Sequence, residues 1–168
     1  IGQVHHSWFL TEPGTEPVEV AVKLQYPGAG AALQSDLRQI ARLARLLGAF
    51  APGIDVKSLV AEMQERGVEE LDYSLEAEAQ AIFADGFADD PVIVIPRPLA
   101  HTEHALVSQW LPGDRSLADV VNDESQEERN RLAEAFVRFL FTGPSRAGLL
   151  HADPHPGNFR VLPAGRLG

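Results

Sequence analysis

A loop near the C-terminal end of the sequence carries the residue types best suited to chemistry. Asp153 and Asn158 stand five residues apart in the run HADPHPGN, residues 151–158, where two prolines and a glycine oppose helix formation. Phosphoryl transfer from a nucleotide needs such a pair, because an aspartate can accept the proton of the attacking group and an asparagine can ligate magnesium on the phosphates. The spacing therefore indicates a catalytic loop, with Asp153 as the catalytic base and Asn158 as the metal ligand.

Two other interpretations of this loop stay open. His151, Asp153 and His155 alternate, and such a run could hold zinc or a pair of divalent metals in a metal-dependent hydrolase. A site of that type needs further ligands, and the remaining histidines come in two pairs without a shared framework, at His5, His6, His101 and His104. The third interpretation is a polar turn between a helix and a strand.

Composition limits the protein class. The 168 residues have room for one domain, and 45% hydrophobic with 23% charged residues is ordinary for a globular chain. Fourteen Lys and Arg against 24 Asp and Glu give a net charge of -10, which argues against a nucleic-acid partner. The absence of cysteine excludes disulfides and thiol catalysis. No apolar run of about 18 residues occurs, so we predict no membrane span within this sequence and a cytoplasmic location.

Hydrophobic periodicity predicts the order of the elements. We expect strands at 3–10 and 18–25, helices at 31–50, 55–66 and 69–83, strands at 92–95 and 105–111, and helices at 116–121 and 124–141 before the loop. Asp55 would cap the second helix and Gly67 would end it. The third helix would bury a stripe of Leu71, Leu75, Ala79 and Ile82. This order of elements predicts an α+β, protein-kinase-like fold. It would consist of a small antiparallel sheet with regulatory helices, followed by the first part of a helical lobe.

Lys23 fits that fold as a cleft residue. It ends the tetrapeptide VAVK in the second strand, close to the V-A-I-K pattern whose lysine holds the α and β phosphates. Strand alternation places Ala21 and Lys23 on one face. Asp72 and Glu76 are four residues apart and would share a helix face, where Lys23 and a metal-bound nucleotide would relieve their repulsion. An acidic helix surface is the alternative. We predict an ion pair between Lys23 and Glu76.

Four segments, in the same order along the chain, carry a family resemblance. They are IGQVH at 1–5, VAVKLQYPG at 20–28, ELDYSLEA at 70–77 and HADPHPGN at 151–158. Together they resemble the UbiB family of atypical kinases, the AarF/ADCK-type proteins linked to ubiquinone biosynthesis. The resemblance implies a protein-kinase-like fold that binds ATP with Mg²⁺, with an alanine-rich loop in place of the glycine-rich one.

The resemblance also implies site roles. Lys23 matches the phosphate-binding lysine, Glu76 its partner on the regulatory helix, Asp153 the catalytic aspartate, Asn158 the magnesium ligand and His151 a structural histidine. The implied nucleotide-binding segments also contain Gly2, Gln3, Val4 and Ala21. Gly2 and Val4 fit the end of a G-x-G-x-x-G-x-V phosphate loop.

A regulatory motif and the chain boundaries follow from the same resemblance. Glu70 and Asp72 match a Glu-x-Asp motif that in the family meets an N-terminal Lys-x-Gly-Gln extension and restrains access to the site. That extension and the Asp-Phe-Gly motif are not in the sequence. We therefore expect an incomplete kinase-like domain that is inactive alone, with 1–111 as an N-lobe bearing inserted helices and 112–168 as the start of a helical C-lobe.

Function classes other than a UbiB-type kinase remain. A small-molecule phosphotransferase of the aminoglycoside-kinase type would share the catalytic loop, but its phosphate-side motifs would not resemble residues 1–5 or 70–77. A regulatory nucleotide-binding module would need the same ATP-binding residues. The resemblance admits lipid or quinone-biosynthesis proteins as partners, and a peripheral membrane position for the full-length protein.

Overall fold

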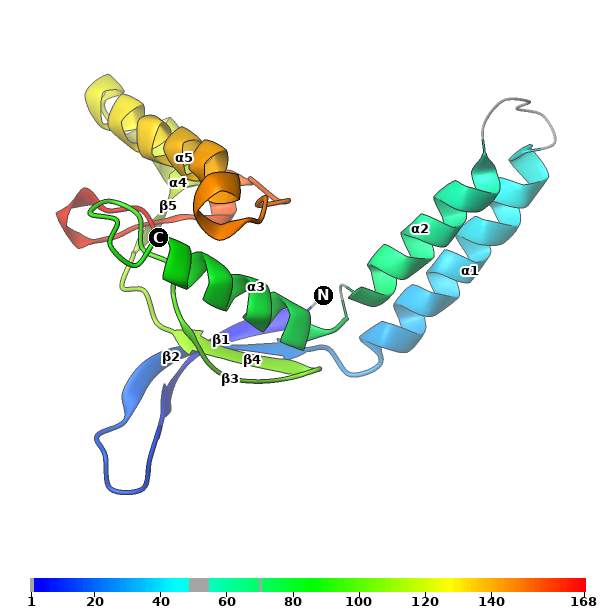
Figure 1. Ribbon diagram of the computed structural model, residues 1–168, viewed down its shortest axis with the longest axis horizontal. Coiled ribbons are helices and arrows are strands. Elements are labelled where there is room, and N and C mark those ends of the chain that lie inside the picture. Colours follow the sequence, from blue (N-terminus) through cyan, green and yellow to red (C-terminus); the bar gives the residue numbers. More distant parts are fainter. Residues whose placement is uncertain (1, 49–54, 70) are drawn as a thin grey trace.

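The protein is described by a computed structural model that covers residues 2–48, 55–69 and 71–168. Its N-terminal part is built on a four-stranded antiparallel sheet in the order β1-β2-β4-β3, formed by β1 (Gly2–Phe9), β2 (Val18–Gln25), β3 (Pro98–Thr102) and β4 (Ala105–Gln109). Helix α3 (Tyr73–Gly86) packs against this sheet and also against the helical C-terminal part (Figure 1). The predicted α+β architecture is confirmed.

The first hairpin forms where the sequence predicts it. β1 and β2 pair without a register shift from Gly2 opposite Gln25 to Phe9 opposite Val18. The alternating β-branched residues of β2 favour a pleated strand, and Val20 at its centre is fully buried. Gly14 supplies a positive φ of 88° in the connecting turn.

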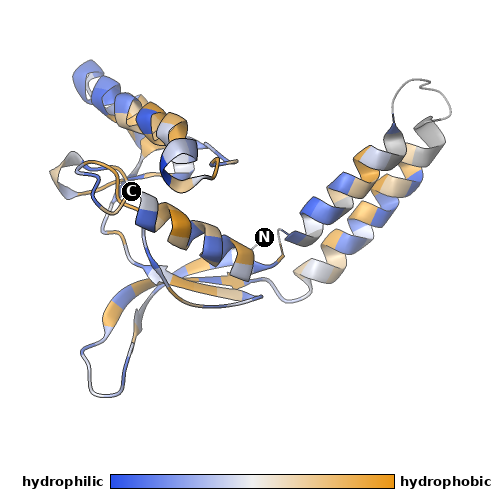
Figure 2. Ribbon diagram, viewed as in Figure 1, coloured by the Kyte–Doolittle hydropathy of each residue, from blue (hydrophilic) through white to orange (hydrophobic). Residues whose placement is uncertain are grey.

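A helical hairpin is inserted between β2 and α3. Helices α1 (Ala29–Gly48) and α2 (Val56–Glu69) pack on one another and project away from the sheet, with hydrophobic residues along both (Figures 1 and 2). The prediction that Gly67 ends the second helix is wrong. A Cβ atom at Gly67 would lie 2.6 Å from Leu37 Cδ1, so this glycine allows close helix contact and α2 continues to Glu69. The expected end of the first helix, at residue 50, lies outside the described residues.

Helix α3 starts later than predicted and buries a different face. Asp72, not a helical residue, caps it by accepting a hydrogen bond from the backbone N–H of Ser74 at 2.8 Å. The predicted stripe is wrong at Leu75 and Ile82, which are 46% and 44% exposed. The buried residues are instead Tyr73, Ala77, Phe83 and Ala84. The reason is that α3 contacts two neighbours, the sheet near its start and α5 near its end, so no single stripe describes its burial.

The strand predicted at 92–95 is also wrong. Only Ile93 forms an isolated bridge there, to Leu167, and the regular strand lies further on as β3. The Asp90 carboxylate accepts hydrogen bonds from the backbone N–H groups of Val92 and Ile93, at 3.0 and 2.9 Å. Because a side chain takes these donors, they are not free for a strand ladder.

The C-terminal part is mainly helical. It contains β5 (Arg115–Ser116), α4 (Leu117–Asp123), α5 (Gln126–Ala147), the short 3₁₀ helices η1 (Pro156–Asn158) and η2 (Pro163–Gly165), and β6 (Arg160–Val161). The prediction that the long helix ends at Phe141 is wrong, because α5 runs through Pro144 and ends before Gly148, whose φ is 70°. In the part of the chain that is described, no helix is both long and apolar enough to cross a membrane.

One aromatic core joins the two parts. The rings of Phe83 on α3 and of Phe87, the residue directly after α3, lie 5.7 and 5.3 Å from that of Phe139 on α5. Phe159, directly after η1, packs 5.6 Å from Phe139. Such ring pairs contribute beyond the area they bury, so this core fixes α3 against the C-terminal loop.

Candidate active site

Lys23 and Glu76 form the predicted ion pair, which confirms their expected contact. The Lys23 ammonium group donates to both carboxylate oxygens of Glu76, at 2.8 and 2.5 Å. The two side chains keep 31% and 43% of their surface exposed. The ammonium group also lies 4.6 Å from the centre of the Tyr73 ring. Lys23 is therefore held in place while remaining accessible to a further anion.

Strand register shows which residues share the face of Lys23. Val4 lies opposite Lys23 and Gly2 opposite Gln25, and directly opposed residues of an antiparallel pair project to the same side. Val4 is 62% exposed, so apolar surface is left open beside the lysine. Gln3 lies opposite Leu24 and hence points to the other face. The assignment of Gln3 to the nucleotide-binding segment stays a prediction, and with this register Gln3 would act through its backbone and not through its side chain.

Gly2 has a packing role that the sequence pattern did not predict. A Cβ atom there would overlap the carbonyl oxygen of Leu24 and would lie 2.5 Å from the Tyr73 hydroxyl group. The absence of a side chain thus lets α3 approach the edge of the sheet, close to the ion pair.

We expect Gly2→Ala to lower the free energy of unfolding by about 1–3 kcal/mol, the usual range for overpacking. Gly30→Ala is the matched control, because its Cβ atom would make only an ordinary contact, 3.5 Å from Leu71 Cδ1. Urea unfolding of both variants checks the expectation. Equal stability of Gly2→Ala and the parent would show that this contact is not tight.

Asp153 and Asn158 are joined within the C-terminal loop. The Asn158 side-chain amide donates to Asp153 Oδ2 at 2.9 Å and to the Asp153 carbonyl oxygen at 3.2 Å. His155 starts η1, because its Nδ1 atom accepts the backbone N–H of Gly157 at 3.0 Å. The loop thus presents a carboxylate and an amide oxygen together at an exposed position, and these are the ligand types that Mg²⁺ prefers.

His151, at the start of the loop, packs against the aromatic core. Its ring centre lies 5.5 Å from Phe139, 5.6 Å from Phe159 and 6.3 Å from Phe83. Burial among these rings lowers the pKa of His151, and the Asp153 charge opposes that effect only in part. Its buried Nδ1 atom has no hydrogen-bond partner among the described residues. These surroundings suit a neutral packing residue.

The alternative metal site at His151, Asp153 and His155 does not form. His151 is packed among phenylalanines, and His155 Nδ1 is taken by Gly157. Throughout residues 2–48, 55–69 and 71–168, no group of three or more His, Cys, Asp or Glu side chains could hold a metal ion. The alternation of His151, Asp153 and His155 thus does not produce the converging ligands that a zinc hydrolase needs.

The expected Glu-x-Asp motif is only partly described. Glu70 lies outside the described residues. Asp72 is the N-cap of α3 and does not share a helix face with Glu76, because its side chain turns to the backbone N–H of Ser74. The prediction that Asp72 lies within the helix is therefore wrong.

Helix α3 links the two residue pairs. Glu76 lies in its first turn, and Phe83, seven residues or about 10 Å further along, contacts the His151 ring. No hydrogen bond or ion pair between described residues joins Lys23 and Glu76 directly to Asp153 and Asn158. The arrangement offers a cationic site for phosphate on the sheet and oxygen ligands for a metal on the loop.

The sequence pattern did not predict a polar contact on the sheet face that carries Lys23. Gln80 donates to the Pro96 carbonyl oxygen at 2.6 Å and to Ser108 Oγ at 3.0 Å. Ser108 is 7% exposed and lies opposite Ala21 on the face of Lys23. The available signal was the position of Gln80 one turn after Glu76, since residues four apart share a helix face.

Comparison with known proteins decides the family. All 168 residues match the family model described as the ABC1 atypical kinase-like domain. The chain belongs to this family. It is 31% identical to Protein ACTIVITY OF BC1 COMPLEX KINASE 1, chloroplastic, of Arabidopsis thaliana, over 89% of this chain and 23% of that protein. It is 29% identical to Atypical kinase COQ8B, mitochondrial, of Rattus norvegicus, over 95% of this chain and 29% of that protein.

A solved structure shares the fold. The ABC1-family chain superposes with a TM-score of 0.87 on a structure described as the Rv3197-erythromycin complex from Mycobacterium tuberculosis. The two share 39% identity, over all of this chain and 41% of that one. The family resemblance and the kinase-like fold predicted from the sequence are thus confirmed. The chain spans only about a fifth to a third of the length of the curated relatives it matches.

Proposed function

We propose that this chain carries the nucleotide-binding face and the catalytic loop of an atypical kinase that uses Mg-ATP. The observation that supports this most strongly is the ion pair of Lys23 with Glu76, on the sheet face that also carries Val4 and Ala21. Family membership supports phosphotransferase chemistry in general, and the ion pair supports a specific place for the phosphates.

The described residues have the chemistry needed to bind Mg-ATP as a phosphate donor. The Lys23 ammonium group would hold the phosphates, and Glu76 would keep it in position. Asn158 would ligate the metal, and Asp153 would accept or orient the proton of the attacking group. Bound magnesium would supply neutralisation of phosphate charge. In this proposal residues 1–111 form the N-lobe with its inserted helices, 112–168 begin the C-lobe, and activity needs the whole protein.

The acceptor is a separate part of the proposal. One relative is named Atypical kinase COQ8B, mitochondrial, and another is named Protein ACTIVITY OF BC1 COMPLEX KINASE 1, chloroplastic. By this analogy we propose that the whole protein supports isoprenoid-quinone or lipid-related metabolism, with lipid or quinone-biosynthesis proteins as partners and a peripheral position at a membrane. A kinase of the aminoglycoside type lacks equal support, because the match to the ABC1 family covers the whole chain.

In the full-length protein, we expect Lys23→Ala and Asn158→Ala each to weaken Mg-ATP binding by about 10- to 100-fold, since each removes a charged or metal-linked contact. Calorimetric titration with Mg-ATP measures this. Arg38→Ala on α1 and Asn122→Ala on α4 are the matched controls, because both residues are exposed and lie outside the site. Parent-like affinity in both site variants would contradict the proposed nucleotide site.

A second function is favoured by the solved relative, whose structure is described as a complex with erythromycin. The identity of 39% extends over the whole of this chain. We propose that the present protein also binds a molecule of this kind, which combines a large apolar ring with a basic amine. Equilibrium dialysis of the full-length protein against erythromycin tests this second function.

A further inference from the structure

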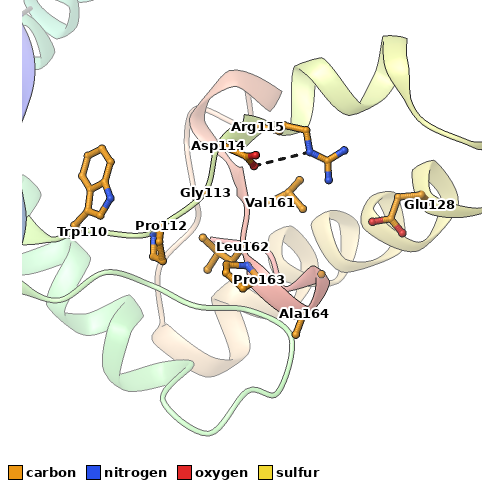
Figure 3. A pocket seen from close by; sticks show the side chains of 11 residues that line it. Trp110, Pro112, Gly113, Asp114, Arg115, Glu128, Val161, Leu162, Pro163 and Ala164 are labelled. Carbon is orange, nitrogen blue, oxygen red and sulfur yellow. Dashed lines mark ion pairs between the residues drawn. The ribbon is translucent and has the colours of Figure 1, made fainter.

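A cavity of about 710 Å³ is lined by residues other than those assigned to nucleotide or metal. It is bounded by the segment that follows β4, by the β6–η2 segment and by the start of α5 (Figure 3). Its volume falls in the range of small-molecule sites. Lys23, Glu76, Asp153 and Asn158 are not among its lining residues, so the cavity and the proposed kinase site do not share these side chains.

The apolar part of this cavity is held firmly. Trp110, Pro112, Leu162 and Pro163 supply apolar surface, as Figure 3 shows. The Trp110 ring stacks on His6 with centroids 4.1 Å apart and planes 18° apart. Because the stack fixes the indole before any ligand arrives, binding would cost little side-chain entropy there.

The cavity rim is fixed by an unusual backbone. Ala164 has a φ of 60°, the one positive φ of a non-glycine residue in the described chain. Arg131 donates to the carbonyl oxygen of the next residue, Gly165, at 2.7 Å. Residues held in this region are typical of functional sites, where the surrounding structure maintains the strain.

The charges around the cavity favour a cation. Both carboxylate oxygens of Glu128 accept hydrogen bonds from Arg131, at 2.8 and 2.7 Å, and these bonds lower the pKa of Glu128. The Arg115 guanidinium pairs with Glu124. Asp114 reaches Arg115 only at 4.0 Å and its side chain is 93% exposed. Asp114 is therefore the least engaged of these carboxylates.

Trp110, on another wall of the cavity, also favours a cationic ligand. The face of an indole ring attracts a cation, and Trp110 is the aromatic side chain of the cavity. The 168-residue sequence carries a net charge of -10, which also favours a cationic ligand. Arg115 also lines the cavity but is paired with Glu124, so Asp114 is the lining carboxylate that remains available to a cationic ligand.

We infer that this cavity binds an amphipathic organic cation, an apolar ring system that carries a protonated amine, with Asp114 as the counter-ion and Trp110 as the apolar wall. The inference rests on the second function proposed above and gives it a site. Erythromycin belongs to this chemical class, because its macrolactone is apolar and its amino sugar is protonated at neutral pH. No covalent step is involved.

The test is binding of erythromycin to the full-length protein by equilibrium dialysis. We expect Asp114→Asn to weaken binding about fivefold, as for a largely exposed ion pair, and Trp110→Ala about thirtyfold, as for an aromatic residue that a ligand covers. Asp123→Asn, at the exposed end of α4, is the matched control and should bind as the parent does. Because Asp114 packs against little, its variant remains informative even where Trp110→Ala is unstable.

A second probe isolates the charge. Erythromycin N-oxide lacks the protonated amine, so its affinity should be the same for the parent and for Asp114→Asn. If the parent binds erythromycin and Asp114→Asn binds it equally well, the cavity inference is overturned while the second function stands. If the parent binds no erythromycin, the second function itself fails. Mg-ATP binding by Asp114→Asn should equal that of the parent in either case.

Discussion

Asp153→Asn in the full-length protein should lower turnover by about 10²- to 10⁴-fold, the usual contribution of a positioned general base. The amide has the shape of the carboxylate, and its oxygen can still accept the 2.9 Å hydrogen bond from Asn158. The loop should therefore keep its geometry and lose only the proton acceptor. Affinity for Mg-ATP should change far less, because Lys23 and Asn158 are the groups proposed to hold the donor. Steady-state phosphate release and Mg-ATP titration measure the two effects separately.

His155→Ala supplies the contrast for this prediction. The kinase assignment predicts a modest structural loss, since His155 only caps the backbone N–H of Gly157. A metal hydrolase would instead lose bound zinc or manganese together with its activity. Elemental analysis of both variants distinguishes these outcomes. Release of tightly bound zinc by His155→Ala would overturn the kinase assignment, and unchanged turnover in Asp153→Asn would remove Asp153 from the chemistry.

The ion pair at the sheet could be predicted because its determinants are local. Alternation along β2 gives the face of Lys23, and the helical pattern around Glu76 gives the carboxylate-bearing helix. The order of elements then brings that helix back over the strand. The detail that failed was Asp72, because the same residue type serves as a helix cap or as a surface charge, and only the start of α3 decides between them.

The other wrong predictions have their cause in contacts between residues that are far apart in the sequence. The pattern at residues 92–95 is apolar and β-branched, as in a strand, but Asp90 takes two of its backbone donors. Asp90 is in turn held by Arg138 and Arg146 on α5, 48 and 56 residues away. Gly2 is similar, since the phosphate-loop pattern predicts a flexible glycine and the structure adds a contact with Tyr73 on α3. Periodicity within a short window carries no information on such partners.

The buried carboxylate of Asp90 should be the most sensitive structural position outside the site. Its side chain is 2% exposed and accepts hydrogen bonds from Arg138 and Arg146 at 2.7 and 2.6 Å. Burial raises the pKa of Asp90, but hydrogen bonds from two backbone amides and from Arg146 outweigh it, so the pKa lies below its ordinary value of 3.8. The ionised form is therefore the one that stabilises the fold.

Asp90→Asn should lower the free energy of unfolding by about 3 kcal/mol at pH 7, because two guanidinium groups lose their shared charge and the segment before β3 loses its anchor. A depressed pKa in the folded state means that the contribution is complete well above pH 3.8 and is lost as the pH falls below that value. The stability difference between parent and variant should accordingly narrow in acid. Urea unfolding at pH 7 and near pH 3 measures this, with Asp89→Asn at the exposed neighbouring carboxylate as the matched control. A difference that stays constant between the two pH values would show that packing, and not the charge of Asp90, holds this segment against α5.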